Sequence, residues 1–213
     1  MKKPARKIKA SKKGSFRGKF PSKKNRKMIY WESLLERDYI KTLEFDKEVL
    51  MFESQPLEIE YFYCGKRRSY FPDFLVTMRT EKVYLVEVKP IDKVEEEENK
   101  IKAEVGRMYS EEKEWEYKIV TEKDIRKGYF LENFNFLKNY NKERTSVRKL
   151  ACLQRLYEEN IPCSISELKK KALMEMDDGE FYVHLYYMVY EQIIETNLYK
   201  EKINEETILG KLF

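Results

Sequence analysis

The sequence carries two apolar runs that each hold charged residues, Tyr70-Phe71-Pro72-Asp73-Phe74-Leu75-Val76 and Val86-Glu87-Val88-Lys89. Both runs are rich in aromatic and β-branched residues and are separated by polar turn residues, so we expect two adjacent strands. Glu87 and Lys89 are two residues apart and therefore project from the same face of a strand. Strand pairing would bring Asp73 close to Glu87. Such charges on apolar strands are costly unless they are paired or bind a metal ion.

These side chains suit the hydrolysis of phosphodiester bonds. Carboxylate oxygens are the ligands that Mg²⁺ prefers, and we expect Mn²⁺ to substitute for it. A bound cation lowers the pKa of a water molecule and stabilises charge at the scissile phosphate. Lys89 would orient or activate the attacking water, or stabilise the transition state. The structural alternative for Asp73, Glu87 and Lys89 is an ion pair at a strand end.

The single histidine and the three cysteines exclude other chemistries. His184 lies in an aromatic stretch, where we expect a structural role, and sites that need paired histidines are excluded. Cys64, Cys152 and Cys163 are widely spaced and form no CxxC motif. We therefore expect reduced thiols rather than a disulfide framework or a zinc site.

A helix is expected before the strands, over residues 30–43, because its apolar residues recur at helical spacing. Glu32 and Glu36 share one face of this helix, and either is a candidate for a further metal ligand. Ser33 and Glu36 also match a capping box, which is the structural alternative for Glu36.

The remaining elements complete an α/β pattern. We expect strands at 57–63, 69–77 and 83–88 in an antiparallel meander, then a helix at 92–109, a strand at 115–120 and a further helix. This order predicts a mixed sheet flanked by helices. We assign residues 29–140 to this domain.

The N-terminal segment is strongly basic. Residues 1–28 contain thirteen Lys or Arg and no Asp or Glu, so the rest of the chain carries −8 against a total of +5. A block of like charge with Gly, Ser and Pro is expected to be disordered alone and to bind a polyanion. The alternative is a solubility or localisation tail. The candidate DNA-binding residues of this arm are Lys12, Lys13, Arg17, Lys23, Lys24, Arg26 and Lys27.

Residues 141–213 read as a separate, small winged-helix-like domain. Helices are expected at 147–160, after Ser164 and at 180–197, followed by a tail that could form a β-wing. The last helix contains no Lys or Arg, unlike a recognition helix that reads DNA. Four tyrosines on this helix favour a protein interface, with core packing as the alternative: Tyr182, Tyr186, Tyr187 and Tyr190.

Residues 30–125 resemble a known family. The Asp73…Glu87-x-Lys89 set with this element order resembles the restriction-endonuclease-like, PD-(D/E)xK, fold. More specifically, the chain resembles the TnsA family, the endonuclease subunit of heteromeric cut-and-paste transposases. The matching stretches are 32–38 (ESLLERD), 43–49 (LEFDKEV), 54–56 (SQP), 72–76 (PDFLV), 87–90 (EVKP) and 121–125 (TEKDI).

The resemblance implies roles for particular residues. It implies that Glu36, rather than Glu32, is the helix carboxylate, that Asp73 and Glu87 are metal ligands, and that Lys89 is the catalytic lysine. Some family members have Gln at the position of Glu87. The family cuts DNA at the 5′ ends of a transposon and works with a separate transposase subunit and an AAA-type ATPase regulator. The resemblance also implies that residues 141–213 contact this regulator.

We therefore expect a Mg²⁺-dependent endonuclease acting on double-stranded DNA at transposon ends. The alternatives are another nuclease of this fold, such as a resolvase or restriction subunit, and a non-enzymatic adaptor tethered to DNA. No apolar run approaches the roughly 20 residues of a membrane span, so no membrane partner is expected. The expected location is the cytoplasm of a bacterial or phage-like system, in association with the nucleoid.

Overall fold

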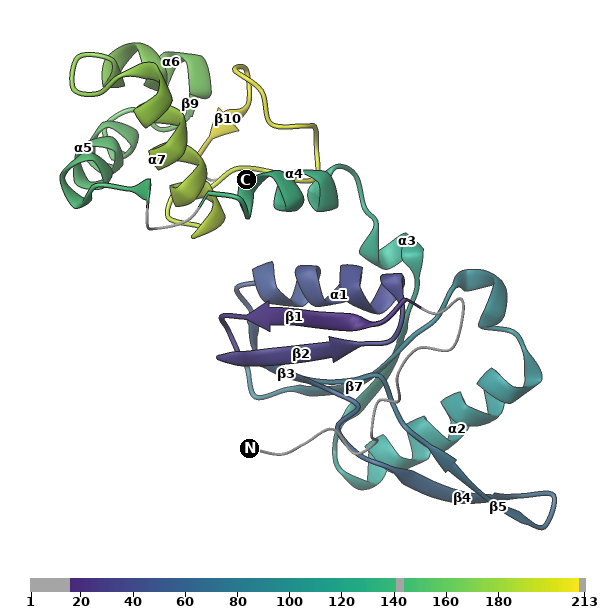
Figure 1. Ribbon diagram of the computed structural model, residues 1–213. Coiled ribbons are helices and arrows are strands. Elements are labelled where there is room, and N and C mark those ends of the chain that lie inside the picture. The colour runs from purple at the N-terminus through teal and green to yellow at the C-terminus, as the bar shows by residue number, and fades with distance from the viewer. Residues whose placement is uncertain (1–15, 141–143, 211–213) are drawn as a thin grey trace. The chain divides into compact units, whose positions relative to one another are not determined.

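The structure is a computed structural model that describes residues 16–140 and 144–210 (Figure 1). The chain divides into two compact units, Met1–Ile125 and Arg126–Phe213. This division falls before the boundary expected near residue 140. No helix in the described ranges is long and apolar enough to cross a membrane.

A four-stranded mixed sheet is the centre of the first unit. Its order is β3 (Val49–Ser54), β6 (Phe74–Met78), β7 (Val83–Val88) and β8 (Glu116–Val120). The first three strands are antiparallel, and β7 and β8 are parallel. A parallel pair needs a long crossover, which α2 (Glu97–Glu112) supplies. The sheet with its helices confirms the expected α/β class.

The two faces of β7 pack against different helices. Val86 and Val88 join a buried cluster with α1 (Leu34–Phe45), to which Phe52 and Phe74 also belong. Leu85 points the other way, into a second cluster with residues of α2. Glu87 is two residues from Leu85 and lies on this second face. The short helices η1 (Ile91–Lys93) and α3 (Glu122–Ile125) follow β7 and β8.

The expectation that residues 1–28 are disordered is wrong for the part that the structure describes. Residues 18–31 form an antiparallel hairpin of β1 (Gly18–Ser22) and β2 (Lys27–Trp31). Ile29 is buried, and Phe20 and Trp31 pack against the same core. The order arises because carboxylates from outside the basic block engage its backbone and side chains.

Several of the predicted DNA-binding residues contribute to these contacts. Arg17 lies 3.5 Å from Glu32, and Lys27 lies 3.8 Å from Glu53. The backbone N–H groups of Lys23 and Lys24 donate to Glu44 Oε1. Lys24 Nζ also donates to the Val49 carbonyl at 2.7 Å. Arg26 lies in the hairpin turn with φ 52°, and Lys12 and Lys13 lie outside the described residues.

The expected meander is also wrong in its pairing. The run at 69–77 is interrupted at Phe71-Pro72-Asp73, so it forms the end of one strand and the start of another. β5 (Lys66–Tyr70) pairs with β4 (Ile59–Tyr63) in a separate two-stranded ribbon, whereas β6 pairs with β3 and β7. The strand β3 was not among the expected elements.

The described residues of the second unit form four longer helices and a short two-stranded sheet. They are α4 (Phe130–Leu137), α5 (Val147–Glu158), α6 (Ile165–Ala172) and α7 (Asp178–Tyr190), with β9 (Cys163–Ser164) paired to β10 (Ile208–Leu209). Helix α4 belongs here, contrary to the expected boundary, because Asn133 Nδ2 donates to the Leu198 and Glu201 carbonyls at 2.8 Å. Thr196 forms an isolated bridge with Leu209. The winged-helix assignment stays a prediction.

Candidate active site

The strand register places Asp73 opposite Glu87. Phe74 pairs with Val86 in the antiparallel β6–β7 ladder. Extending this register by one residue brings Asp73, which directly precedes β6, level with Glu87. The backbone N–H of Val88 donates to Asp73 Oδ2 at 2.8 Å and fixes the carboxylate beside β7. The structure therefore brings together the two carboxylates that the sequence singled out.

Glu87 is only 5% exposed and is paired with Lys89. Lys89 Nζ lies 2.7 Å from Glu87 Oε1, and the lysine side chain keeps 26% of its surface exposed. The backbone N–H of Lys89 donates to the Val120 carbonyl at 3.0 Å, which continues the β7–β8 pairing and holds the lysine in place. Lys89 thus connects a buried carboxylate with solvent.

Two tyrosines complete the surroundings of Glu87. Tyr70 OH donates to Glu87 Oε2 at 2.7 Å and lies 3.1 Å from Tyr117 OH. Burial, with Glu87 nearby, raises the pKa of Tyr70, so the phenol remains a hydrogen-bond donor. Sequence reasoning assigned no role to either residue. For Tyr70 the available signal was its place three residues before Asp73.

Glu36 combines a capping contact with proximity to the charged cluster. Ser33 Oγ accepts a hydrogen bond from the Glu36 N–H at 3.1 Å, while Glu36 Oε2 accepts one from the Glu32 N–H at 2.8 Å. The second bond differs from a capping box, in which the Ser33 N–H would be the donor. Burial raises the pKa of Glu36, and the positive charge of Lys89 opposes that rise.

Glu32, the other candidate ligand, lies before the Ser33 cap of α1 and not on a face of the helix as expected, and it is held by different partners. Its Oε2 accepts a hydrogen bond from Gln55 Nε2 at 3.1 Å. The Gln55 N–H in turn donates to the Asp73 carbonyl at 2.8 Å. Gln55 therefore links Glu32, next to the N-cap of α1, to the backbone of the candidate site, a role that sequence reasoning did not identify.

The charges of the cluster are coupled through space. Burial raises the pKa of Asp73 well above its usual value, and the neighbouring Glu87 and Glu36 add to the rise. Burial alone would lower the pKa of Lys89, but Asp73 and Glu87 outweigh it and raise the value. One ammonium group thus partly offsets the repulsion among three carboxyl groups.

The donor chemistry fits a divalent cation. Asp73, Glu87 and Glu36 offer hard oxygen ligands, and a cation would relieve the repulsion that raises the pKa of Asp73. Within residues 16–140 and 144–210, however, no three His, Cys, Asp or Glu side chains are already gathered as a metal-binding group. The Lys89 ammonium lies against one Glu87 oxygen, so this contact would have to rearrange if Glu87 is to bind a metal.

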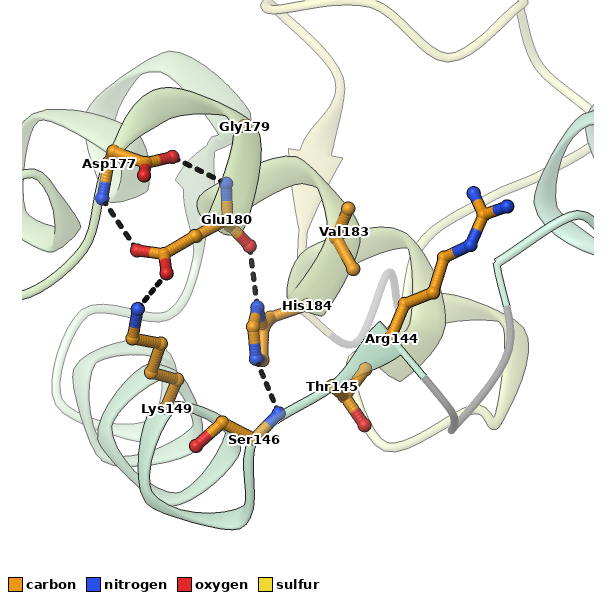
Figure 2. A pocket seen from close by; sticks show the side chains of 9 residues that line it. All are labelled: Arg144, Thr145, Ser146, Lys149, Asp177, Gly179, Glu180, Val183 and His184. Atoms are coloured by element: carbon orange, nitrogen blue, oxygen red, sulfur yellow. Dashed lines mark hydrogen bonds and ion pairs between the residues drawn. The ribbon is translucent and has the colours of Figure 1, made fainter.

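The second unit contains a pocket of different character, shown in Figure 2. Its volume is about 520 Å³, and Lys149 and Glu180 form an ion pair within it. His184 Nε2 accepts a hydrogen bond from the Ser146 N–H at 2.9 Å, and His184 Nδ1 lies 2.6 Å from the Glu180 carbonyl. Nε2 therefore connects α7 with the start of α5, whereas Nδ1 contacts the backbone of its own helix, and both contacts suit the structural role expected for this histidine. Cys64, Cys152 and Cys163 are free thiols.

Comparison with known proteins finds a similarity within the first unit. Residues 46–122 match the family described as TnsA-like endonuclease N terminal. The matched range contains Asp73, Glu87 and Lys89, and Glu36 lies outside it. No curated protein matches the chain significantly. The mixed sheet flanked by helices is consistent with the restriction-endonuclease-like fold. Residues 46–122 are therefore similar to the N-terminal domain of TnsA-like endonucleases, and this match supports a TnsA-family assignment.

Proposed function

We propose that the protein is a divalent-metal-dependent DNA endonuclease that cuts at the 5′ ends of a transposon. One observation carries the proposal: Asp73, Glu87 and Lys89 converge where β6 begins and β7 ends, within a TnsA-like endonuclease domain. A partly exposed lysine beside buried carboxylates can meet a DNA phosphate from the solvent side. The location of the cut at the transposon end is inferred from the family resemblance.

Each residue of the cluster has a proposed role. Asp73 and Glu87 would hold Mg²⁺ or Mn²⁺, with Glu36 as the third carboxylate. When bound, such a cation supplies water activation and stabilises charge at the scissile phosphate. Lys89 would orient the attacking water or stabilise the transition state. Tyr70 and the Val88 N–H hold the two carboxylates in position.

The second unit is proposed to contact an AAA-type ATPase regulator, and a separate transposase subunit would process the 3′ ends. An aromatic group at the surface of α4 and α7 supports a protein interface. Phe136 and Tyr140 lie 4.8 and 4.9 Å from the ring of Tyr186, and Tyr182 stacks on Tyr186 at 5.5 Å. Phe136 keeps 40% of its surface exposed. Aromatic residues are enriched in protein interfaces.

The proposal is tested by cleavage of DNA that carries a transposon end, with reconstituted transposase and regulator in Mg²⁺ or Mn²⁺. We expect Asp73→Asn and Lys89→Ala each to lower the cleavage rate by about 100-fold or more, because each removes a group that acts at the phosphate. Mapping of the cut strand should place the breaks at 5′ ends. Chelation of the divalent cation should abolish them.

A matched control is Lys82→Ala, which removes an exposed lysine at the other end of β7. This variant should cleave like the wild type, and circular dichroism should show that all three variants are folded. Undiminished cleavage by both Asp73→Asn and Lys89→Ala would overturn the proposal.

A non-enzymatic adaptor is the second candidate, and the Lys89–Glu87 ion pair favours it, since both Glu87 oxygens already have partners. Calorimetry separates the two candidates. Binding of Mg²⁺ or Mn²⁺ that Asp73→Asn abolishes supports the endonuclease. Absence of such binding, with and without DNA, supports the adaptor.

A further inference from the structure

The β4–β5 ribbon is a regular element that pairs with no other strand in the described residues. Its strands form five residue pairs, from Ile59↔Tyr70 to Tyr63↔Lys66. Cys64 and Gly65 make the turn, and both have positive φ, at 48° and 69°. A two-residue turn with two left-handed positions matches the natural twist of a hairpin. The ribbon therefore extends about 17 Å from its base, at about 3.4 Å per residue.

The tip of the ribbon is cationic and carries an exposed aromatic ring. Residues 61–72 contain Lys66, Arg67 and Arg68 and no Asp or Glu. Phe62 is 78% exposed and lies opposite Arg67. Arg67 pairs with Glu60, whereas Arg68 lies over the Tyr63 ring at 5.0 Å. The register places Phe62 and Arg67 on one face of the ribbon, and Lys66 and Arg68 on the other. Phe62 belongs to neither buried cluster of this unit.

The base of the ribbon is part of the candidate active site. Tyr70, the last residue of β5, donates to Glu87 Oε2 at 2.7 Å. Ile59, Tyr70 and Leu85 share one buried cluster, which also packs on α2. Nearer the tip, Tyr63 OH donates to Glu97 Oε1 at 3.0 Å, at the start of α2. The ribbon is thus fixed in direction relative to the carboxylates.

We propose that the β4–β5 ribbon binds double-stranded DNA beside the cut, through Phe62, Lys66 and Arg68. This inference rests on the proposed function, because it takes the scissile phosphate to lie at Asp73, Glu87 and Lys89. A two-stranded ribbon fits the major groove, and lysine and arginine bind phosphates with release of counterions. The Phe62 ring, on the opposite face of the ribbon from Lys66 and Arg68, would make apolar contact with a thymine methyl group at the floor of the groove.

The length of the ribbon predicts how far from the cut the turn should contact DNA. A reach of about 17 Å corresponds to about five base pairs, at 3.4 Å for each step along a strand. The turn at Cys64 should therefore lie within about five base pairs of the cleaved phosphate. Contacts at the base and the tip would then set the direction in which the duplex crosses the site.

Cys64 allows a direct test, because it is exposed at the turn, whereas Cys152 is partly buried and Cys163 buried. A maleimide photo-cross-linker attached to Cys64 of the full chain, in a Cys152→Ser background, should react with a transposon-end duplex. The cross-links should map within about five base pairs of the 5′ cut. A Cys64→Ser version of this protein should give no such cross-links. Cross-linking to the transposase or regulator instead of DNA would overturn the proposal.

The second arm measures affinity for a labelled duplex by fluorescence anisotropy over a series of salt concentrations. The double variant Lys66→Ala/Arg68→Ala should bind more weakly and reduce the slope of log K against log salt by about 1.8, since each lost phosphate contact contributes about 0.9. Phe62→Ala should weaken binding and leave this slope unchanged. The control Lys82→Ala/Lys113→Ala removes the same charge at the far ends of β7 and α2 and should retain the wild-type slope.

The two proposals fail in different ways. If the wild type cuts transposon ends and the ribbon variants keep its affinity and slope, the ribbon proposal is overturned and the proposed function stands. If Asp73→Asn and Lys89→Ala cut as well as the wild type, the proposed function fails. The ribbon proposal then fails too, because it places the scissile phosphate at these residues.

Discussion

At the scale of single residues, the Glu87 carboxylate is a buried charge that needs hydrogen-bond and ion-pair partners. It is held by the Lys89 ammonium on one oxygen and by the Tyr70 hydroxyl on the other. A buried carboxylate is stable only while its partners remain. Removing one donor therefore lowers the free energy of unfolding, because the carboxylate oxygen stays buried without a hydrogen bond. The Tyr70 hydroxyl is therefore a stabilising group as well as one that positions Glu87.

Replacing Tyr70 with Phe tests this view. Tyr70→Phe should lower the free energy of unfolding by about 1–3 kcal/mol, because it leaves a buried carboxylate oxygen without its donor. Urea denaturation measures the change. Tyr117→Phe is the matched control, because Tyr117 OH lies 3.1 Å from Tyr70 OH, whereas Tyr70 OH is the group that donates to Glu87 Oε2. The cost of Tyr117→Phe should be smaller. Equal costs for the two variants would contradict the assignment.

The residues of the candidate site were predictable to different degrees. Asp73, Glu87 and Lys89 follow from two short apolar runs, because alternation along a strand fixes which side chains share a face. Tyr70 and Gln55 act through contacts with residues distant in sequence, Glu87 and Glu32. No local pattern reports such contacts. Gln55 also has a positive φ of 45°, which its residue type does not predict.

At the scale of elements, sequence patterns predicted correctly those features whose hydrogen bonds lie within a few residues of each other. Ser164 and Glu167 form the predicted capping box at the start of α6. Strand β3 escaped prediction because its apolar residues do not alternate regularly, and its pairing with β6 shifts register between Val49 and Met51. The β1–β2 hairpin escaped because carboxylates far along the chain, such as Glu44 and Glu53, offset its positive charge.

The capping box at α6 gives a prediction with an internal control. Ser164→Ala should lower the stability of the second unit by about 1 kcal/mol, because it removes the acceptor of the Glu167 N–H. Ser146 occupies the same position at the start of α5 but makes no capping bond with its side chain. Ser146→Ala should therefore cost much less. Circular dichroism during urea denaturation compares the two, and equal losses would show that the capping bond is not what stabilises α6.

At the scale of the whole molecule, the two units have separate cores and separate spectroscopic signals. The two tryptophans, Trp31 and Trp115, both lie in the first unit. Circular dichroism in the far ultraviolet reports the helices of both units. Tryptophan fluorescence therefore follows the unfolding of the first unit alone, and any difference between the two signals belongs to the second unit.

This separation predicts opposite outcomes for two core substitutions. Phe52 and Phe181 have no exposed surface and lie in the first and second units, and replacing either with Ala should cost about 3–5 kcal/mol. Phe181→Ala should lower the midpoint of helix loss by circular dichroism and leave the fluorescence midpoint in place. Phe52→Ala should lower the fluorescence midpoint. A fluorescence midpoint that falls equally in both variants would show that the two units unfold as one cooperative body, because the loss in one core would then destabilise the other.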